Sequence, residues 1–186
     1  KDGTLEVSRI AFDIGVAVAQ WQALTWEGFG VLDEGLRGYR PSYADYFHLR
    51  LEEHLYFLKT RGFLDDTNEI LAEIEKHHAL LAVDRGCLVH KDLALWNILG
   101  TPDEIAAFID FDDAISGDPM DDLSLLACFH DAAFLQRTLE GYQSVRRLPE
   151  DYRRRFWLHL LRNMIVKSVI ENIDAVGGPR GRFDVF

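Results

Sequence analysis

Two short polar motifs in the middle of the chain carry residue types suited to phosphoryl transfer. The first places His90, Asp92 and Asn97 in the pattern H-x-D-x-x-x-x-N between apolar flanks. The second places Asp110 thirteen residues after Asn97, at the end of another apolar run. An Asp in a loop can accept the proton of a substrate hydroxyl, while an Asn and a second Asp offer the hard oxygen ligands that Mg²⁺ prefers. The short connection from Gly100 to Glu104 predicts a hairpin that brings Asn97 and Asp110 together.

Acidic side chains concentrate around these motifs. The chain has 186 residues, with 31 Asp and Glu against 20 Lys and Arg and a formal net charge of −11. Residues 92–136 hold ten of the acidic residues and no Lys or Arg. Carboxylates without local cations repel each other and raise each other's pKa, and a divalent cation is one way to relieve this. On charge alone, the alternative to a cation site is that this segment is an acidic loop exposed to solvent.

Composition restricts the class of protein further. With 48% hydrophobic residues the chain is a folded domain and not a disordered segment. No 18-residue uncharged run is present, and the acidic balance lacks a basic run, so neither a membrane nor a nucleic acid is the expected partner. Two cysteines, Cys87 and Cys128, are too few for a disulfide framework and favour a cytoplasmic protein.

The sequence around the motifs predicts the elements that position them. Apolar residues at helical spacing predict helices over residues 5–24, 42–60, 66–82, 123–134 and 149–173. Ser42, with Asp45 three residues later, resembles a capping box and is predicted to cap the second of these helices. Short apolar runs bounded by Gly and Pro predict strands over residues 87–90, 97–99 and 105–109. Residues 31–41 are predicted as a loop, and residues 177–182 as a poorly ordered tail. The expected fold is mainly α with a few short β-hairpin strands, an α+β class.

The two motifs resemble those of the aminoglycoside phosphotransferase and choline kinase-like family, which has a protein-kinase-like fold. The runs are LVHKDLALWNIL at residues 88–99 and FIDFDDAISGDPMDDLSLL at residues 108–126. The family's versions usually read HGDLHxxN and ID-[WF]-[ED]-x-A-x-x-GDPxxDLA. A stretch from Trp21 to Gly30 is similar to the family segment that leads out of the region between the lobes.

The resemblance implies an ATP- and Mg²⁺-dependent kinase that phosphorylates a hydroxyl of a small molecule. It implies Asp92 as catalytic base, with His90 bracing the catalytic loop, and Asn97 and Asp110 as ligands of nucleotide-bound Mg²⁺. Asp112 is implied as an assisting ligand of a second metal ion. The acidic residues between positions 33 and 75 leave a cationic acceptor open as an alternative. In the second motif, Asp118 and Asp122 match positions with structural roles, which cap the following helix and tie the loop to it.

Two positions depart from the family pattern. Lys91 replaces the usual Gly of HGD, and we expect its side chain to be solvated. Trp96 lies where the family has a less bulky stretch, and we expect it to pack in the core. Away from the motifs, His77 and His78 follow Glu73 without forming H-E-x-x-H, so they are predicted to face solvent.

The sequence lacks the features of a nucleotide-binding lobe. No G-x-G-x-x-G occurs, and none of its lysines (Lys1, Lys59, Lys76, Lys91 and Lys167) lies on a candidate strand of such a lobe. The chain also begins with Lys-Asp-Gly and no initiator Met. We therefore expect residues 1–186 to be a C-terminal lobe whose N-terminal lobe is missing, and which is inactive alone.

Two alternative functions remain open from the sequence. Asp110 and Asp112 form D-x-D after an apolar strand, which is the nucleophile motif of haloacid-dehalogenase-like phosphatases. Against this, the residues that follow and the surrounding elements do not match that class. The second alternative is a non-catalytic binding module, such as a pseudokinase lobe, which the missing nucleotide-binding features suggest.

Overall fold

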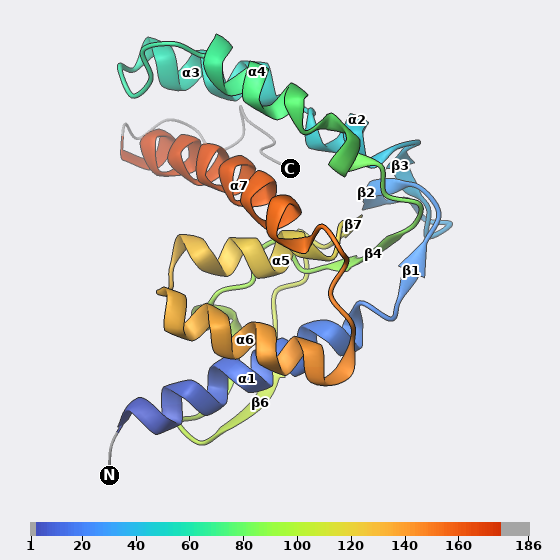
Figure 1. Ribbon diagram of the computed structural model, residues 1–186, viewed down its shortest axis with the longest axis vertical. Helices are drawn as coiled ribbons and strands as arrows, with labels where there is room; N and C mark the ends of the chain where they lie inside the picture. Colours follow the sequence, from blue (N-terminus) through green and yellow to red (C-terminus); the bar gives the residue numbers. More distant parts are fainter. Residues whose placement is uncertain (1–2, 176–186) are drawn as a thin grey trace.

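The structure is a computed structural model that describes residues 3–175, so the tail predicted at residues 177–182 lies outside the described residues. Its α-helices and strands combine in an α+β fold, which confirms the expected class. Figure 1 shows α7 running between an arm of short helices, α2 to α4, and a group formed by α1, α5 and α6. No helix within the described range is long and apolar enough to cross a bilayer.

The helices follow the predicted order with more interruptions than the apolar pattern suggests. The α-helices are α1 (Gly3–Trp21), α2 (Tyr43–Phe47), α3 (Leu51–Thr60), α4 (Asn68–Lys76), α5 (Met120–Leu125), α6 (Ala132–Val145) and α7 (Tyr152–Ala175). The part of the chain that the structure describes also has the short 3₁₀ helices η1 (His78–Leu81), η2 (Leu95–Asn97) and η3 (Leu126–Cys128).

The predicted single helices over 42–60, 66–82 and 123–134 are each divided in the structure. Arg50 adopts a positive φ of 57° between α2 and α3, which ends one helix and begins the next. Asp131 begins α6 by accepting a hydrogen bond from the backbone N–H of Phe134. The predicted cap at Ser42 is confirmed, because its hydroxyl accepts a hydrogen bond from the backbone N–H of Asp45.

Within residues 3–175, seven strands form two antiparallel sheets. They are β1 (Thr25–Trp26), β2 (Phe29–Leu32), β3 (Gly38–Arg40), β4 (Gly86–Val89), β5 (Ile98–Thr101), β6 (Glu104–Phe108) and β7 (Ile115–Gly117). The larger sheet has the order β1-β4-β7-β2-β3, and β5 pairs with β6 in a separate hairpin.

The prediction of a loop over residues 31–41 is wrong, because β2 and β3 lie largely within it and pair as an antiparallel hairpin. The strands β1 and β7 also have no counterpart in the prediction. These strands are two to four residues long, too short for a periodic pattern. They are stabilised by partners distant in sequence, as in the pairing of Gly30 with Ser116.

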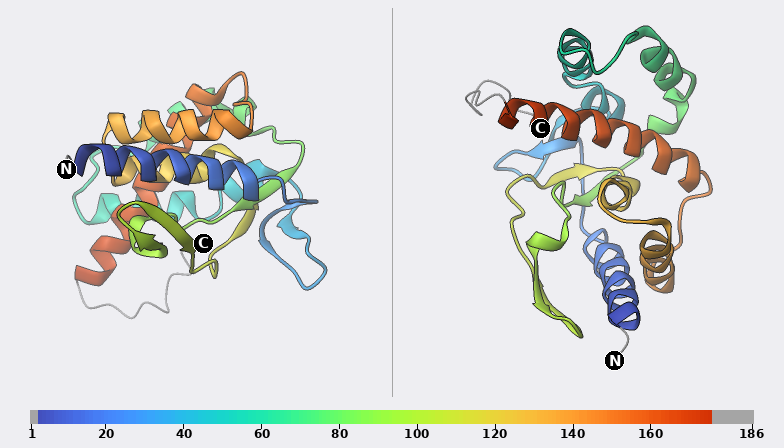
Figure 2. Two further views of the ribbon diagram at one scale, coloured as in Figure 1. Left: turned by 90° about the horizontal axis from the view of Figure 1, so that it is seen from below. Right: turned by 90° about the vertical axis from the view of Figure 1, so that its left-hand side faces the viewer.

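Two hydrophobic cores hold the segment between β4 and β5. The first packs the larger sheet against α2, α3, α4 and α7 and includes Val89 at the end of β4. The second lies among α1, α5 and α6 and includes Leu93. The segment that carries His90, Asp92 and Asn97 therefore passes from one core to the other and is fixed on both sides. The second view of Figure 2 shows the β5–β6 hairpin extending beside α1.

Helices α1 and α6 approach closely at two glycines. A Cβ atom on Gly15 would collide with the backbone of Thr138, and one on Gly141 would collide with the backbone of Phe12. The absence of side chains at these positions lets the two helices cross in backbone contact and close the second core.

Candidate active site

Asp122 at the start of α5 fixes the backbone of the first motif. Its carboxylate accepts hydrogen bonds from the backbone N–H of His90 at 2.9 Å and of Lys91 at 3.1 Å. The side chain is fully buried, and burial raises the pKa of Asp122 to about 6, although the two backbone N–H groups oppose that rise. A loop held by two such hydrogen bonds keeps the following residue, Asp92, in a defined position.

His90 links the two motifs. Its Nε2 lies 2.9 Å from the carbonyl oxygen of Ile109, the residue before Asp110, and its Nδ1 lies 3.3 Å from the backbone nitrogen of Asp92. A neutral ring with the proton on Nε2 satisfies both contacts. The ring has no exposed surface and packs against Phe111 at a centroid distance of 4.2 Å. His90 therefore lies behind the loop and braces it.

The β5–β6 hairpin has the register that the motif spacing predicts. Ile98 pairs with Phe108, and one step further the backbone N–H of Ile109 donates to the carbonyl oxygen of Asn97 at 3.0 Å. Asn97 is thus directly opposite the residue that precedes Asp110. Asp110 itself has a positive φ of 66°, a conformation that Asp tolerates better than most residues, and its side chain is exposed.

Asp92 is held by partners on both carboxylate oxygens. The amide nitrogen of Asn97 donates to Oδ2 at 2.9 Å, and Lys167 Nζ of α7 donates to Oδ1 at 3.2 Å. Burial opposes ionisation of this carboxyl group, but the Lys167 charge and these hydrogen bonds outweigh it and lower the pKa of Asp92. A quarter of the Asp92 side chain remains exposed, at 25%. Asp92 is therefore an accessible carboxylate at neutral pH.

Lys167 is a contact that the sequence analysis missed. It lies 75 residues after Asp92 on α7, and nothing in the sequence of that helix marked one of its residues as functional. Its ammonium group also lies 5.3 Å from the centre of the Phe129 ring. No local signal could have found it, because the contact depends on how α7 crosses the molecule.

Asp113 is a second residue that the sequence analysis did not assign to the site. Burial is the largest cause that raises its pKa, followed by the negative charges of Asp92, Asp110 and Asp112. Four carboxyl groups from both motifs are therefore near enough to influence one another. The side chains of Asp110 and Asp112 are exposed, so a ligand from solvent can reach them.

Lys91 is buried, and the prediction of a solvated side chain is wrong. Its Nζ contacts both carboxylate oxygens of Asp121 at 3.1 Å and Asn163 Oδ1 at 3.2 Å. Burial disfavours the ammonium ion, but Asp121 outweighs that cost and raises the pKa of Lys91. The backbone of Lys91 has a positive φ of 72°, which favours glycine.

Trp96 is exposed, so the prediction that it packs in the core is also wrong. Its side chain is 61% accessible and lies edge-on to Phe129 with ring centroids 5.2 Å apart. A hydrogen bond from Trp96 is among the contacts that lower the pKa of Asp92. The Trp96–Phe129 pair therefore forms an exposed aromatic surface beside Asp92.

Comparison with known proteins identifies the family of the chain. The model of the phosphotransferase enzyme family, APH, matches residues 2–157. The chain belongs to this phosphotransferase family. A search of curated protein sequences returns no match.

Several solved structures of phosphotransferases share the fold. A protein from Thermobifida fusca described as a fructosamine-3-kinase is 23% identical with a TM-score of 0.65, covering 87% of this chain and 59% of that chain. Aminoglycoside phosphotransferase APH(4)-Ia in a ternary complex with ADP and hygromycin B is 20% identical with a TM-score of 0.67, covering 92% and 61%. The streptomycin–ATP–APH(2″)-IIa complex is 22% identical with a TM-score of 0.59, covering 92% and 58%. At these identities the structures establish the kinase-like fold, and the chain spans about three fifths of each.

The family and the fold argue against the haloacid-dehalogenase-like alternative. That hypothesis needs Asp110 at the end of a strand in an α/β core, whereas Asp110 follows β6 of a two-stranded antiparallel hairpin. The phosphotransferase fold leaves this alternative without structural support.

Asp118 in the second motif has the structural contacts predicted for it. Its Oδ1 accepts a hydrogen bond from the backbone N–H of Met120 at 2.8 Å, which begins α5. Its Oδ2 lies 2.6 Å from Arg155 and 3.5 Å from His159, both on α7. Asp118 thus joins the second motif to α7, the helix that also supplies Lys167.

Proposed function

We propose that the protein transfers the γ-phosphoryl group of ATP, with Mg²⁺, to a hydroxyl of a small molecule in the cytoplasm. We further propose that this chain is the C-terminal lobe of that kinase. One observation carries the proposal: Asn97 donates to Asp92 and, across the hairpin, lies opposite the residue before Asp110. A proton acceptor and two oxygen ligands are thereby joined in one rigid unit, which is what phosphoryl transfer requires.

Asp92 is proposed as the base that orients the acceptor hydroxyl and receives its proton. The lowered pKa of Asp92 keeps it ionised at neutral pH, so it can accept a hydrogen bond from the hydroxyl before the proton moves. Since Lys167 and Asn97 already hold its oxygens, the hydroxyl approaches a carboxylate of fixed orientation.

The residues around Asp92 have the chemistry to hold Mg²⁺. Asn97 uses its amide nitrogen on Asp92, so its oxygen is the atom suited to a cation. Asp110 contributes a carboxylate, and Asp112 is proposed to assist. Mutual repulsion with Asp92, Asp110 and Asp112 contributes to the raised pKa of Asp113, which indicates negative charge that a cation would neutralise. Bound Mg²⁺ would supply charge neutralisation for the transferred phosphoryl group.

His90 is proposed as a positioning residue of this centre. Its buried ring ties the Asp92 backbone to Ile109, so it fixes the distance between the two motifs without touching a substrate. Asp122 supports the same loop from the opposite side through the backbone of His90 and Lys91.

The nucleotide is proposed to require a second lobe. The chain spans about three fifths of the kinase-like structures it resembles, and two of these were determined with ADP or with ATP. We propose that a preceding segment supplies the adenine site and the phosphate-binding Lys, as in other kinases.

The acceptor is proposed to bind over Trp96 and Phe129. Both rings are exposed; Trp96 contacts the Asp92 carboxylate, and the Lys167 ammonium group already lies against Phe129. An exposed aromatic ring beside a carboxylate favours an acceptor that stacks on Trp96 and carries a positive charge.

Phosphoryl transfer by the protein with its preceding segment tests the proposal. Asp92→Asn should lower kcat by about 10²–10⁴-fold, because it removes the base while keeping the size of the side chain. Asp103→Asn, in the exposed turn of the hairpin, is the matched control and should leave kcat unchanged. Asn97→Ala and Asp110→Asn should raise the Mg²⁺ concentration needed for half-maximal activity.

Two outcomes would contradict the proposal. Full turnover in Asp92→Asn would remove Asp92 as the base. A wild-type protein that binds ATP and Mg²⁺ but transfers no phosphoryl group to any hydroxyl or to water would favour the non-catalytic binding module.

A further inference from the structure

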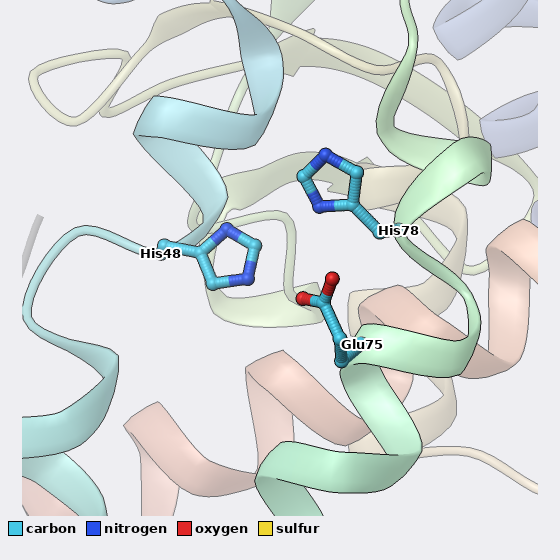
Figure 3. Close-up of side chains that lie close together, drawn as sticks. All are labelled: His48, Glu75 and His78. Carbon is cyan, nitrogen blue, oxygen red and sulfur yellow. The ribbon is translucent and has the colours of Figure 1, made fainter.

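His48, Glu75 and His78 converge on one point although they come from different segments. His48 ends α2, Glu75 lies in the last turn of α4, and His78 begins η1. One ligand atom from each lies within 4.8 Å of the others. Figure 3 shows the two rings and the carboxylate directed toward a common space between them. From this arrangement we propose a zinc-type metal site, formed by two imidazole nitrogens and one carboxylate oxygen.

The environment of His48 prepares its ring for a metal. Its Nδ1 lies 2.8 Å from the carbonyl oxygen of Ala44, so Nδ1 carries the proton and donates it. The other nitrogen, Nε2, then holds a free lone pair. Metal-binding histidines commonly donate their second ring nitrogen to a backbone carbonyl in this way, which fixes both tautomer and orientation. The ring also packs edge-on against Phe47 at a centroid distance of 5.5 Å.

The two neighbouring histidines differ in their contacts. His77 Nε2 lies 3.3 Å from Glu73 Oε1, and its Nδ1 lies 3.4 Å from the Arg154 guanidinium, so both ring nitrogens face other partners. His78 instead lies with its ring centre 6.0 Å from that of His48. Its exposed side chain and that of Glu75 can both adjust to a ligand. His78 is exposed to solvent, as the sequence predicts, and its role in this cluster is part of the proposal.

The ligand set indicates which cation fits. Two His nitrogens and one Glu oxygen are a set that zinc sites use, with a fourth position open to water. Mg²⁺ prefers oxygen ligands, so it would compete poorly here. The site would join the end of α2 to the start of η1, and its residues are not among those proposed to bind nucleotide-bound Mg²⁺.

Metal titration of the full chain tests this site directly. The probe is Zn²⁺, followed by calorimetry in excess Mg²⁺, with Co²⁺ absorption as a second readout of His coordination. We expect one Zn²⁺ per chain. His48→Ala and His78→Ala should each weaken binding by more than the roughly 10–100-fold typical of losing an outer hydrogen-bond partner. Glu75→Gln should weaken it as well, because the neutral amide is a poorer ligand.

His77→Ala is the matched control, because it removes an adjacent imidazole that lies outside the cluster. It should bind Zn²⁺ like the wild type. Circular dichroism confirms that each variant is folded. Absence of saturable binding, or equal loss in His77→Ala and His78→Ala, would overturn the proposal.

Discussion

Lys167 Nζ lies 3.2 Å from Asp92 Oδ1, and this ion pair joins α7 to the loop that carries the proposed base. The two side chains are only partly exposed, at 21% for Lys167 and 25% for Asp92, so solvent screens their attraction incompletely. The pair favours the ionised form of the one carboxylate on which the proposed mechanism depends.

Lys167→Met should raise the pKa of Asp92. Loss of an adjacent positive charge removes an interaction that favours the carboxylate, so the pKa of the carboxyl group rises. Carbon-detected NMR titration of Asp92 in this chain measures the shift, and Lys167→Arg is the control that keeps the charge. In the active protein, the acidic limb of kcat/KM should move to higher pH by a similar amount. A titration curve of Asp92 that is the same in Lys167→Met and the wild type would contradict the role of the pair.

The same pair should contribute to stability at neutral pH. Because the pKa of Asp92 is lowered in the folded state, its contribution is present above the unfolded value of about 3.9. It is lost as the pH falls through the folded value. Urea unfolding of the wild type and Lys167→Met should therefore differ at pH 7 and converge in strong acid. A constant difference at every pH would show that Lys167 acts through packing alone.

Asp122 should have the opposite effect on stability. Its pKa is raised to about 6, so the folded state binds its proton more tightly than the unfolded chain does. Its contribution is complete below about pH 4 and is lost as the pH rises to about 6, by an amount of order 1–3 kcal/mol.

Asp122→Asn should remove this loss of stability between pH 4 and pH 6, as measured by urea unfolding between pH 4 and 7.

Asp118→Asn is an informative comparison. Burial opposes its ionisation, but His159 and Arg155 outweigh this and lower the pKa of Asp118. The Asp118→Asn substitution should therefore remove stability that the wild type has at higher pH. If both variants change the profile in the same direction, the assigned environments are wrong.

Lys91→Met should destabilise the fold by about 3–5 kcal/mol, because it leaves the Asp121 carboxylate buried without its cation. Adding Asp121→Asn to Lys91→Met should recover part of the loss, since Asn carries no charge to bury. Denaturant unfolding of the two single variants and the double variant measures this coupling. Strictly additive effects would mean that the buried pair does not stabilise the fold through its mutual contact.

Gly141→Ala should destabilise the protein even though Ala is the better helix former. The added Cβ meets the backbone of Phe12, so α1 and α6 must separate, at a cost of about 1–3 kcal/mol. Gln143→Ala, at an exposed position of the same helix, should stay within about 0.5 kcal/mol of the wild type. Thermal unfolding compares them, and an unchanged or higher Tm in Gly141→Ala would show that the helices have room to adjust.

The features that the sequence determined by itself depend on neighbours in the chain. The strand–loop–strand spacing from His90 to Asp110 requires a hairpin, and the observed register places Asn97 opposite Ile109 as that spacing predicts. The cap at Ser42 is equally local, since its partner is Asp45. Such features can be predicted because hydrogen bonds over a few residues depend on residue type and spacing. The roles of Asp92, Asn97 and Asp110 remain predictions.

Tertiary structure alone decided the contacts between distant segments. Lys167 meets Asp92, Lys91 enters the core to meet Asp121, and Trp96 remains outside. His48 meets His78 in the same way. These outcomes depend on how α7, α5 and α4 pack, and packing sums many contacts with no fixed separation along the chain. The sequence therefore identified the family, and the residues proposed for phosphoryl transfer, by local pattern. The charge and accessibility of those residues were set by helices whose packing the pattern could not predict.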